Sequence, residues 1–509
     1  MKINQLKGGA VLSYVTIFLT NVVGLLLTPF IIRSLGSAEY GLYTMIGALV
    51  GYMSVLDFGL NNTVVRFVAK YKANDDKEGE ENFLAHSFMI YICISIIVAI
   101  IGSVLYFNLE QLYGNTLTLD QIDKAKTMML ILIFNLAISL PGGAFSGICS
   151  GYEEFILPRI INIIRYIVRS ILVVVILLYG GDSIGLVILD TIMNITIIGI
   201  NAFIAFKLLG ARIRLHQYEK KLFSNILGFS LWIFAFSIVY QMRWQVGQLI
   251  IGVYYSTSIV AIYAVGITLG NYYGAFSSAI STVFLPRAIQ MTVKNIPSKE
   301  LTDTFIKISR VILLVLIYIL GAFIVLGQEF IFYWVGDEYY MAYYYALIIM
   351  IGLTPLLSQG FANNILEAKN LLAYRGRLLL SLTFVGTIIG IFVVKKYGVT
   401  AMVLVTVFFM LAERAIIIPY YIRKAKLDMK RYYKEILPLF FCVVIAIAIN
   451  LLKSNFLPDR NIFVFFGSGL FYTLFYIGIS YFLVTEYEKN LVQSSFKKLI
   501  KIINRKNEA

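Results

Sequence analysis

Four arginines stand inside stretches that are otherwise almost wholly apolar: Arg165, Arg169, Arg243 and Arg414. A charge buried in hydrocarbon is costly, so such a residue pairs with another group or faces a polar cavity, and it is a functional candidate by default. Arg165 and Arg169 are four residues apart and Asn162 precedes Arg165 by three, so a helix would place them on one face. Because the planar guanidinium fork matches phosphate and carboxylate oxygens, this face predicts a site for a ligand with anionic groups.

A second polar face is predicted further along the chain. Gln241, Gln245 and Gln248 follow the i, i+4, i+7 spacing of one helix face and lie beside Arg243. We therefore expect two polar helix faces to meet at one binding site. The predicted substrate-binding residues are Arg165, Arg169, Arg243, Arg414, Gln241, Gln245 and Gln248.

Four acidic residues also fall in or beside apolar stretches: Asp57, Asp190, Glu367 and Glu413. Each could bind a proton or Na⁺. Each could equally form an ion pair with one of the arginines, which would only stabilise the helices, or lie at the membrane interface. The residue types leave both roles open.

The stretches that carry these residues predict a polytopic membrane protein. Of 509 residues, 59% are hydrophobic and 14% charged, and the mean hydropathy is +0.82. No soluble fold could cover so much apolar surface. About fourteen stretches are long enough to cross a bilayer as helices. They lie near residues 9–32, 40–65, 84–107, 127–148, 160–179, 184–206, 224–252, 257–284, 308–328, 341–366, 371–394, 399–422, 435–452 and 461–484.

The basic residues predict the orientation of these spans. If the N-terminus is cytoplasmic, most of the 43 lysines and arginines fall on the cytoplasmic side. We therefore expect both termini in the cytoplasm. The net charge of +15 is then spread over short loops rather than gathered on one basic surface, which argues against nucleic-acid binding.

Two weak internal matches predict a repeat of six spans. "GSAEYGLYTMIGAL" matches "STSIVAIYAVGITL", and "FSGICSGYEEFILPR" matches "FANNILEAKNLLAYR" and aligns Arg159 with Arg375. An even number of crossings preserves direction, so the two halves would be parallel repeats. We expect an N-lobe at 1–222, a C-lobe at 223–432, two extra helices at 433–484 and a basic amphipathic cytoplasmic tail at 485–509.

The sequence lacks the residue patterns that metal binding and nucleotide hydrolysis require. The three cysteines and two histidines have no spacing that suits a metal site, and no phosphate-binding Gly-Lys-Ser/Thr loop is present. The loops between spans are short, which leaves little room for an extramembrane catalytic domain. We therefore expect a protein that is not an enzyme and that has no metal or cofactor.

One family resemblance emerges from the first two spans. "TPFIIRSLGSAEYGLYTM", followed by "LDFGLNNTVVRFVAKY", resembles the opening of bacterial polysaccharide-biosynthesis flippases of the multidrug/oligosaccharidyl-lipid/polysaccharide (MOP) superfamily. The matching positions are Arg33, Leu35, Gly36, Tyr40, Gly41, Asp57, Gly59 and Arg66. The twelve-plus-two helix count extends the likeness over the whole chain.

The resemblance implies a fold like that of multidrug (MATE) transporters and lipid II flippases. It also implies a function: moving undecaprenyl-diphosphate-linked oligosaccharide units from the cytoplasmic to the outer leaflet of the bacterial inner membrane. Membrane lipids and other polysaccharide-assembly proteins are the expected partners, and the last two helices would accommodate the lipid tail. On this interpretation Arg33 and Arg66 gate the transporter or anchor helix ends. An H⁺ or Na⁺ gradient is a candidate energy source for transport.

Two other functions fit parts of the sequence. An ion-coupled multidrug exporter shares the two-lobe architecture, but its usual cationic substrates fit poorly in a cavity lined by arginines. A membrane glycan polymerase or glycosyltransferase would need a large outer loop with acidic residues or a metal motif, and the outer loops here are short.

Overall fold

The computed structural model describes residues 5–54, 59–220, 237–281, 284–294, 296–369, 371–456, 461–490 and 493. Throughout these residues the regular secondary structure is helical. Eleven helices among them are long and apolar enough to cross a membrane. The chain is therefore an all-helical, multi-pass membrane protein, as the hydropathy pattern predicts.

The chain divides into two compact units, formed by residues 1–265 with 383–402 and by residues 266–382 with 403–509. The expected lobes at 1–222 and 223–432 remain a prediction.

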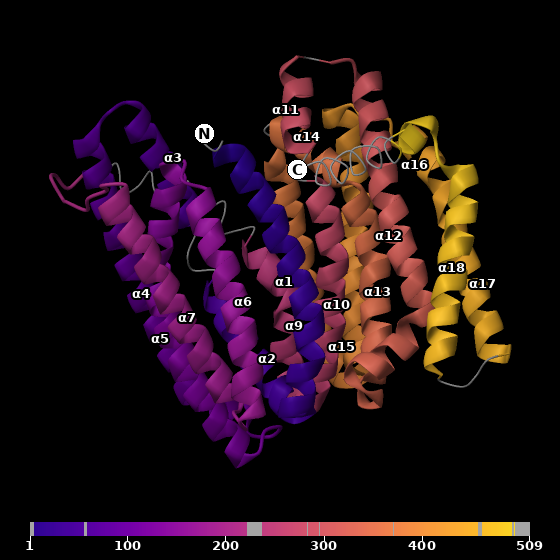
Figure 1. Cartoon of the computed structure of the whole chain (residues 1–509), viewed down its shortest axis with the longest axis horizontal. Coiled ribbons are helices and arrows are strands. Elements are labelled where there is room, and N and C mark those ends of the chain that lie inside the picture. Colours follow the sequence, from indigo (N-terminus) through magenta and orange to yellow (C-terminus); the bar gives the residue numbers. More distant parts are fainter. Residues whose placement is uncertain are drawn as a thin grey trace, which may run out of the picture. The chain divides into compact units, whose positions relative to one another are not determined.

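The first unit contains the helices that carry the first arginine face. Figure 1 shows α4, α5 and α7 running side by side, with α1 and α6 as a neighbouring pair. The helices of this unit are α1 (Gln5–Leu35), α2 (Ser37–Ser54), α3 (Leu60–Ala73), α4 (Lys77–Tyr113), α5 (Leu119–Gly151), α6 (Ile156–Leu178), α7 (Ser183–Phe203), η2 (Ile204–Leu208), α9 (Val246–Tyr254), the first turns of α10 (Thr257–Ser281) and the middle of α15 (Leu372–Tyr420).

Local sequence signals explain where several of these helices begin. Gly36, with φ of +79°, turns the chain between α1 and α2, a conformation that glycine adopts without steric cost. Thr118 and Gln121 form a capping box at the start of α5. Asp182 caps α7 by accepting from the Gly185 backbone N–H.

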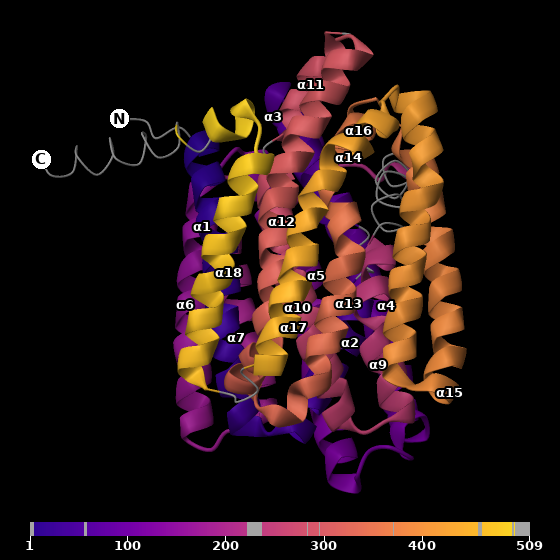
Figure 2. The ribbon, with the colours of Figure 1, turned by 90° about the vertical axis from the view of Figure 1, so that its right-hand side faces the viewer.

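The second unit is arranged around α12 (Ser298–Val335). Figure 2 shows α17 (Phe441–Phe456) and α18 (Ile462–Leu483) lying side by side, and both contact α12. Tyr472 and Tyr476 of α18 donate hydrogen bonds to backbone carbonyls of α12. The remaining helices are the end of α10, α11 (Leu285–Val293), η4 (Asp337–Tyr339), α13 (Tyr340–Ser358), α14 (Gly360–Ala368), parts of α15 (Leu372–Tyr420), η5 (Tyr421–Ala425), α16 (Met429–Ile436) and η6 (Leu437–Phe440).

Some expected spans differ from the helices observed. The span near 40–65 corresponds to two helices, α2 and α3, with 55–58 outside the described residues. The spans at 371–394 and 399–422 correspond to the two arms of α15, which is broken at Gly398 with φ of +84°. Residues 221–236 lie outside the described residues, as does most of the predicted amphipathic tail, so the count of fourteen stays a prediction.

Candidate functional site

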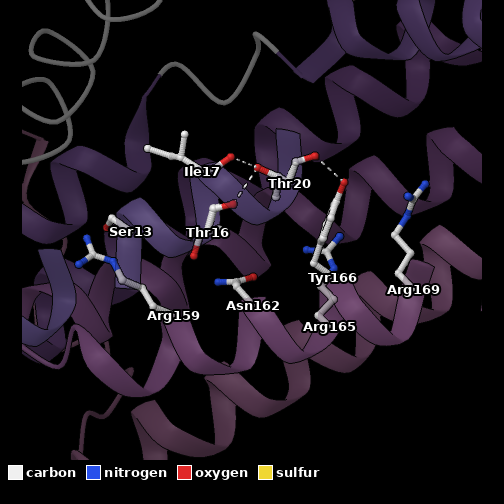
Figure 3. A pocket seen from close by; sticks show the side chains of 9 residues that line it. All are labelled: Ser13, Thr16, Ile17, Thr20, Arg159, Asn162, Arg165, Tyr166 and Arg169. Atoms are coloured by element: carbon white, nitrogen blue, oxygen red, sulfur yellow. Dashed lines mark hydrogen bonds between the residues drawn. The ribbon is translucent and has the colours of Figure 1, made fainter. Parts of the chain in front are cut away.

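Helices α1 and α6 line an open cavity of about 540 Å³ within the first unit, and most of its lining residues have polar side chains. Figure 3 shows its polar side chains arranged in a row along α6, opposite hydroxyl-bearing residues of α1. The lining residues are Ser13, Thr16, Ile17, Thr20, Arg159, Asn162, Arg165, Tyr166 and Arg169. Apart from Ser13, the lining residues belong to Val15–Leu35 and Ile156–Leu178, two segments long and apolar enough to cross a membrane.

The sequence of α6 separates a polar face from a lipid-compatible face. Arg159, Asn162, Arg165 and Arg169 follow one another at spacings of three or four residues, and Tyr166 follows Asn162 by four, which places all five along one side of a helix. The side away from the cavity carries exposed isoleucines, which are Ile160, Ile164, Ile167 and Ile171. The row of arginines spans about 15 Å along the helix axis, at 1.5 Å per residue.

An apolar cluster fixes the far end of α6. Leu27 of α1, Val173 and Leu177 of α6, and Leu186 and Leu189 of α7 are buried together beyond Arg169. Because three helices meet in this cluster, the rotation of α6 about its axis is set by packing. The polar face of α6 is thereby directed toward α1.

Only one of the three cavity arginines forms an ion pair among the described residues. Arg169 donates from Nε and Nη2 to the two carboxylate oxygens of Asp190 on α7, the second at 2.9 Å. Arg159 lies over the ring of Phe155, with 5.8 Å from its guanidinium carbon to the ring centre. Arg165 makes no hydrogen bond or ion pair within the described part of the chain. The cavity therefore carries two arginine charges beyond the one that Asp190 balances.

Two hydroxyl groups of the α1 wall donate hydrogen bonds within their own helix. Thr16 donates to Leu12 O at 2.8 Å and Thr20 to Thr16 O at 2.9 Å, so each hydroxyl oxygen keeps its capacity to accept a bond. Tyr166 of α6 donates to Thr20 O at 3.0 Å and ties the two walls together. The cavity thus combines cationic donors on α6 with neutral acceptors on α1.

The sequence predicted part of this cavity and missed the rest. Arg165 and Arg169 were expected to share a polar face with Asn162, and the structure places all three along the cavity. Arg159 falls just before the expected span at 160–179, but it lies in the first turn of α6. Its spacing of three residues before Asn162 was the available signal. Nothing in the hydropathy of α1 singled out Ser13, Thr16 or Thr20.

The expected glutamine face lies elsewhere in the first unit. Gln241 donates to the Gly51 carbonyl of α2 at 2.9 Å, and Gln248 donates to Gln245 Oε1 at 3.4 Å. Arg243 is half-buried in the same stretch. None of these residues lines the α1–α6 cavity.

The fourth predicted arginine belongs to a buried cluster in the second unit. Arg414 donates to Glu413 Oε1 at 2.7 Å and to the Tyr421 hydroxyl at 3.1 Å, and Tyr421 donates to Asn363 Oδ1 at 2.7 Å. Arg375, on the other arm of α15, lies 3.9 Å from Glu413 Oε1. This is the ion-pairing alternative that the sequence left open for Arg414 and Glu413.

The remaining gating and ion-coupling candidates are dispersed. Arg33 is exposed at the end of α1, Arg66 is exposed on α3 and Glu367 is exposed on α14. Asp190 is paired with Arg169. Asp57 lies outside the described residues.

Outside the candidate spans, the pKa of one tyrosine in the first unit is shifted. Tyr152 follows α5 and donates to Glu80 Oε1 at 2.8 Å. Burial of the ring, together with its bond to the Glu80 carboxylate, raises the pKa of Tyr152 above its usual value. This phenol is therefore a permanent neutral donor that ties the end of α5 to α4.

Comparison with solved structures places this helix arrangement in a known fold. The lipid II flippase MurJ in an inward closed conformation matches 95% of this chain and 99% of its own length, with a TM-score of 0.71 and 18% identity. An inward-facing multidrug resistance MATE family transporter of the MOP superfamily matches 79% and 97%, with a TM-score of 0.53 and 13% identity. A MOP superfamily transporter from Pyrococcus furiosus, described as having a binding pocket of reverse polarity, matches 82% and 93%, with a TM-score of 0.51 and 14% identity.

The sequence comparisons define the family. No curated protein sequence matches the chain. The model of the family described as "Polysaccharide biosynthesis protein" matches residues 6–292, which is more than half of the chain and includes both walls of the α1–α6 cavity. The chain therefore belongs to the polysaccharide biosynthesis protein family, with the fold of the membrane transporters of the MOP superfamily.

Proposed function

We propose that this protein is a flippase for lipid-linked oligosaccharides. It moves undecaprenyl-diphosphate-linked repeat units from the cytoplasmic to the outer leaflet, where they serve assembly of a surface polysaccharide such as O-antigen, capsule or exopolysaccharide. The observation that carries the proposal is the excess of arginine in the α1–α6 cavity, where Arg159 and Arg165 form no ion pair with any described residue.

The chemistry of the cavity suits a diphosphate headgroup. Arg159 and Arg165 are six residues apart on α6, which is about 9 Å along the axis. Two guanidinium groups at this spacing can hold two phosphates of one headgroup from different sides, because each group has several donors in a fixed plane. The acceptor oxygens of Thr16 and Thr20 on the opposite wall suit the hydroxyl groups of sugars.

The membrane potential favours this direction of transport. Moving one negative charge outward across an inside-negative membrane is favourable by about 2.3 kcal/mol per 100 mV. A diphosphate carries about two such charges, so the protein need mainly lower the barrier to carrying the polar head through hydrocarbon. An H⁺ or Na⁺ gradient is not required by this account, although Asp190 is a candidate coupling residue.

The wider architecture follows from the same proposal. The two predicted lobes would rock to give alternating access, and Arg243, Arg414 and the three glutamines would contribute on the side of the predicted C-lobe. Helices α17 and α18 would accommodate the lipid tail. The protein would reside in the bacterial inner membrane with both termini in the cytoplasm, and would act with membrane lipids and other polysaccharide-assembly proteins.

The cation excess disfavours the alternatives. A multidrug exporter with cationic substrates would meet unpaired arginines in this cavity, which repel them. A glycan polymerase or glycosyltransferase would require acidic or metal-binding residues at the cavity, and its lining contains none.

A cell-based experiment tests the proposal. The chromosomal copy is deleted and the cells are complemented with wild type, Arg159→Ala, Arg165→Ala or Arg377→Ala. Arg377 is the matched control because it is an exposed arginine outside the cavity. We expect lipid-linked glycan to accumulate on the cytoplasmic side in the deletion strain and in both cavity variants. Normal export by both cavity variants at wild-type protein level would contradict the proposal.

A further inference from the structure

Helix α2 contacts Asp190, the partner of the cavity residue Arg169, and it also contacts the start of α10. On one side, the Tyr43 hydroxyl lies 3.4 Å from Asp190 Oδ2 and donates to it. On the other side, α2 packs against the start of α10, where a Cβ at Gly41 would collide with the carbonyl oxygen of Thr257. All of these residues belong to the first unit.

The contact between α2 and α10 depends on small side chains. Gly41 allows the two backbones to approach closely, and Ser37 Oγ lies 3.4 Å from Ser258 Oγ. Such a contact is maintained only over a narrow range of helix positions, because small residues have no long side chains to bridge a wider gap. A small displacement of α2 would therefore open it.

Asp190 stands between this helix and the cavity. Its carboxylate accepts both hydrogen bonds from Arg169, which lines the cavity, and a third from Tyr43. The side chains of Arg169 and Asp190 are 21% and 26% exposed, so the pair is shielded enough for its charges to interact strongly. In Figure 3, Arg169 lies at one end of the row of cavity side chains.

We infer that Asp190 is a positioning residue that ties occupancy of the arginine cavity to the contact of α2 with α10. A ligand phosphate that reaches Arg169 competes with Asp190 for the same guanidinium and repels its carboxylate. The Asp190–Tyr43 bond then loses its alignment, and α2 loses one of its ties to the rest of the unit. By linkage, a change in the α2–α10 contact alters the affinity of the cavity for the anion to the same degree.

A second set of polar contacts holds α2 without involving the cavity, and it can be compared with the Tyr43–Asp190 bond. Glu39 accepts from the Ser183 backbone N–H at 2.8 Å and lies 3.2 Å from Lys124 Nζ. Glu39 thus holds the first turn of α2 against the starts of α5 and α7. Loss of this tie should loosen α2 whether or not the cavity is occupied.

Cysteine cross-linking can report the α2–α10 contact directly. In the full-length protein, the native Cys93, Cys149 and Cys442 are first replaced by serine or alanine. Ser37→Cys and Ser258→Cys are then introduced together. The rate of disulfide formation between the two new cysteines is measured in membranes without ligand. Asp190→Asn and Tyr43→Phe should each slow the reaction about fivefold, the low end of typical coupling between sites. Asp123→Asn and Tyr106→Phe are matched controls, because they remove a carboxylate and a phenol that take no part in the relay formed by Arg169, Asp190 and Tyr43. Unchanged rates in both test variants would overturn the inference.

The same cross-linking rate, measured with a ligand, distinguishes failure of this inference from failure of the proposed function. The choice of a diphosphate as ligand rests on that proposed function. Farnesyl diphosphate is the probe, and its binding is measured by calorimetry. We expect it to slow cross-linking in the protein with Asp190, and to have no effect on cross-linking after Asp190→Asn although it still binds. Binding without any change in cross-linking would overturn the relay and leave the flippase proposal standing. Absence of binding, together with slower cross-linking after Asp190→Asn in ligand-free protein, would support the relay and count against a diphosphate substrate.

Discussion

Arg165 and Arg169 are four residues apart on the same face of α6, yet only Arg169 is paired with an acid, Asp190. Two arginines about one helical turn apart thus have different roles: one is held by the fold and the other is available to a ligand. The difference can be measured, because removal of a paired charge affects stability and removal of an unpaired charge does not.

Replacement of Arg165 by alanine should abolish transport without loss of stability. The change leaves no described acidic residue without its ion-pair partner. The melting temperature in detergent should therefore stay within about 2 °C of wild type or rise. Arg165→Lys should retain partial transport, since it keeps the charge but loses the planar fork. A large drop in melting temperature for Arg165→Ala would show that this residue is structural.

Replacement of Arg169 by alanine should destabilise the protein, because Asp190 would remain at membrane depth without its cation. Breaking a fully buried pair costs roughly 3 to 5 kcal/mol, and we expect about 2 kcal/mol here because both side chains are partly exposed. Unfolding in graded denaturant measures the loss. Arg169→Ala combined with Asp190→Ala should recover part of it, and failure of the double variant to do so would contradict the pairing.

The close approach of α2 to α10 predicts a strict requirement for glycine at position 41. Alanine there would push its Cβ into the backbone of Thr257, which cannot give way as a flexible side chain can. Gly41→Ala should therefore slow cross-linking between cysteines at 37 and 258 and reduce transport. Gly47→Ala is the matched control on the same helix, since a Cβ there meets no atom within 4 Å. Equal effects of the two substitutions would argue against the contact.

The buried cluster on α15 predicts that Glu413 is structural rather than ion-coupling. Glu413 is fully buried between Arg375 and Arg414, so Glu413→Gln would leave two arginines without their carboxylate. We expect a several-fold fall in the amount of folded protein, seen by fluorescence-detected size-exclusion chromatography. Glu367→Gln, on an exposed site of α14, should leave the amount unchanged. Normal folding of Glu413→Gln with altered ion dependence of transport would support the coupling role instead.

A second buried pair anchors the chain after α18. Arg310 of α12 donates to Glu488 at 2.7 Å and also to the carbonyl oxygens of Glu435 and Leu483, and both charged side chains are almost fully buried. Glu488→Ala should cost roughly 3 to 5 kcal/mol, because it leaves a buried cation unpaired. Thermal unfolding measures this against Glu486→Ala, an exposed neighbour. Equal melting temperatures for the two variants would contradict the anchor.

The sequence predicts the class of fold because hydrophobic length and charge asymmetry are direct consequences of the bilayer. It also predicts that Arg165, Arg169 and Asn162 share a face, since helical periodicity alone decides this. It could not predict that α1 would be the opposite wall, because the rotation of α6 is set by Leu27, Val173 and their neighbours rather than by periodicity. Nor could it tell Arg169, which is paired, from Arg165, since Asp190 is 21 residues from Arg169 in the chain.

Translocation in reconstituted vesicles tests the central claim most directly. Vesicles are prepared with a fluorescent polyprenyl-diphosphate oligosaccharide in both leaflets, and its accessibility to a membrane-impermeant quencher is followed over time. The wild type and Arg377→Ala should make nearly all of the lipid accessible, whereas Arg165→Ala should leave the inner-leaflet share protected, as in protein-free vesicles. Translocation by Arg165→Ala at the wild-type rate, or protection of the inner-leaflet share in vesicles with the wild type, would contradict the account.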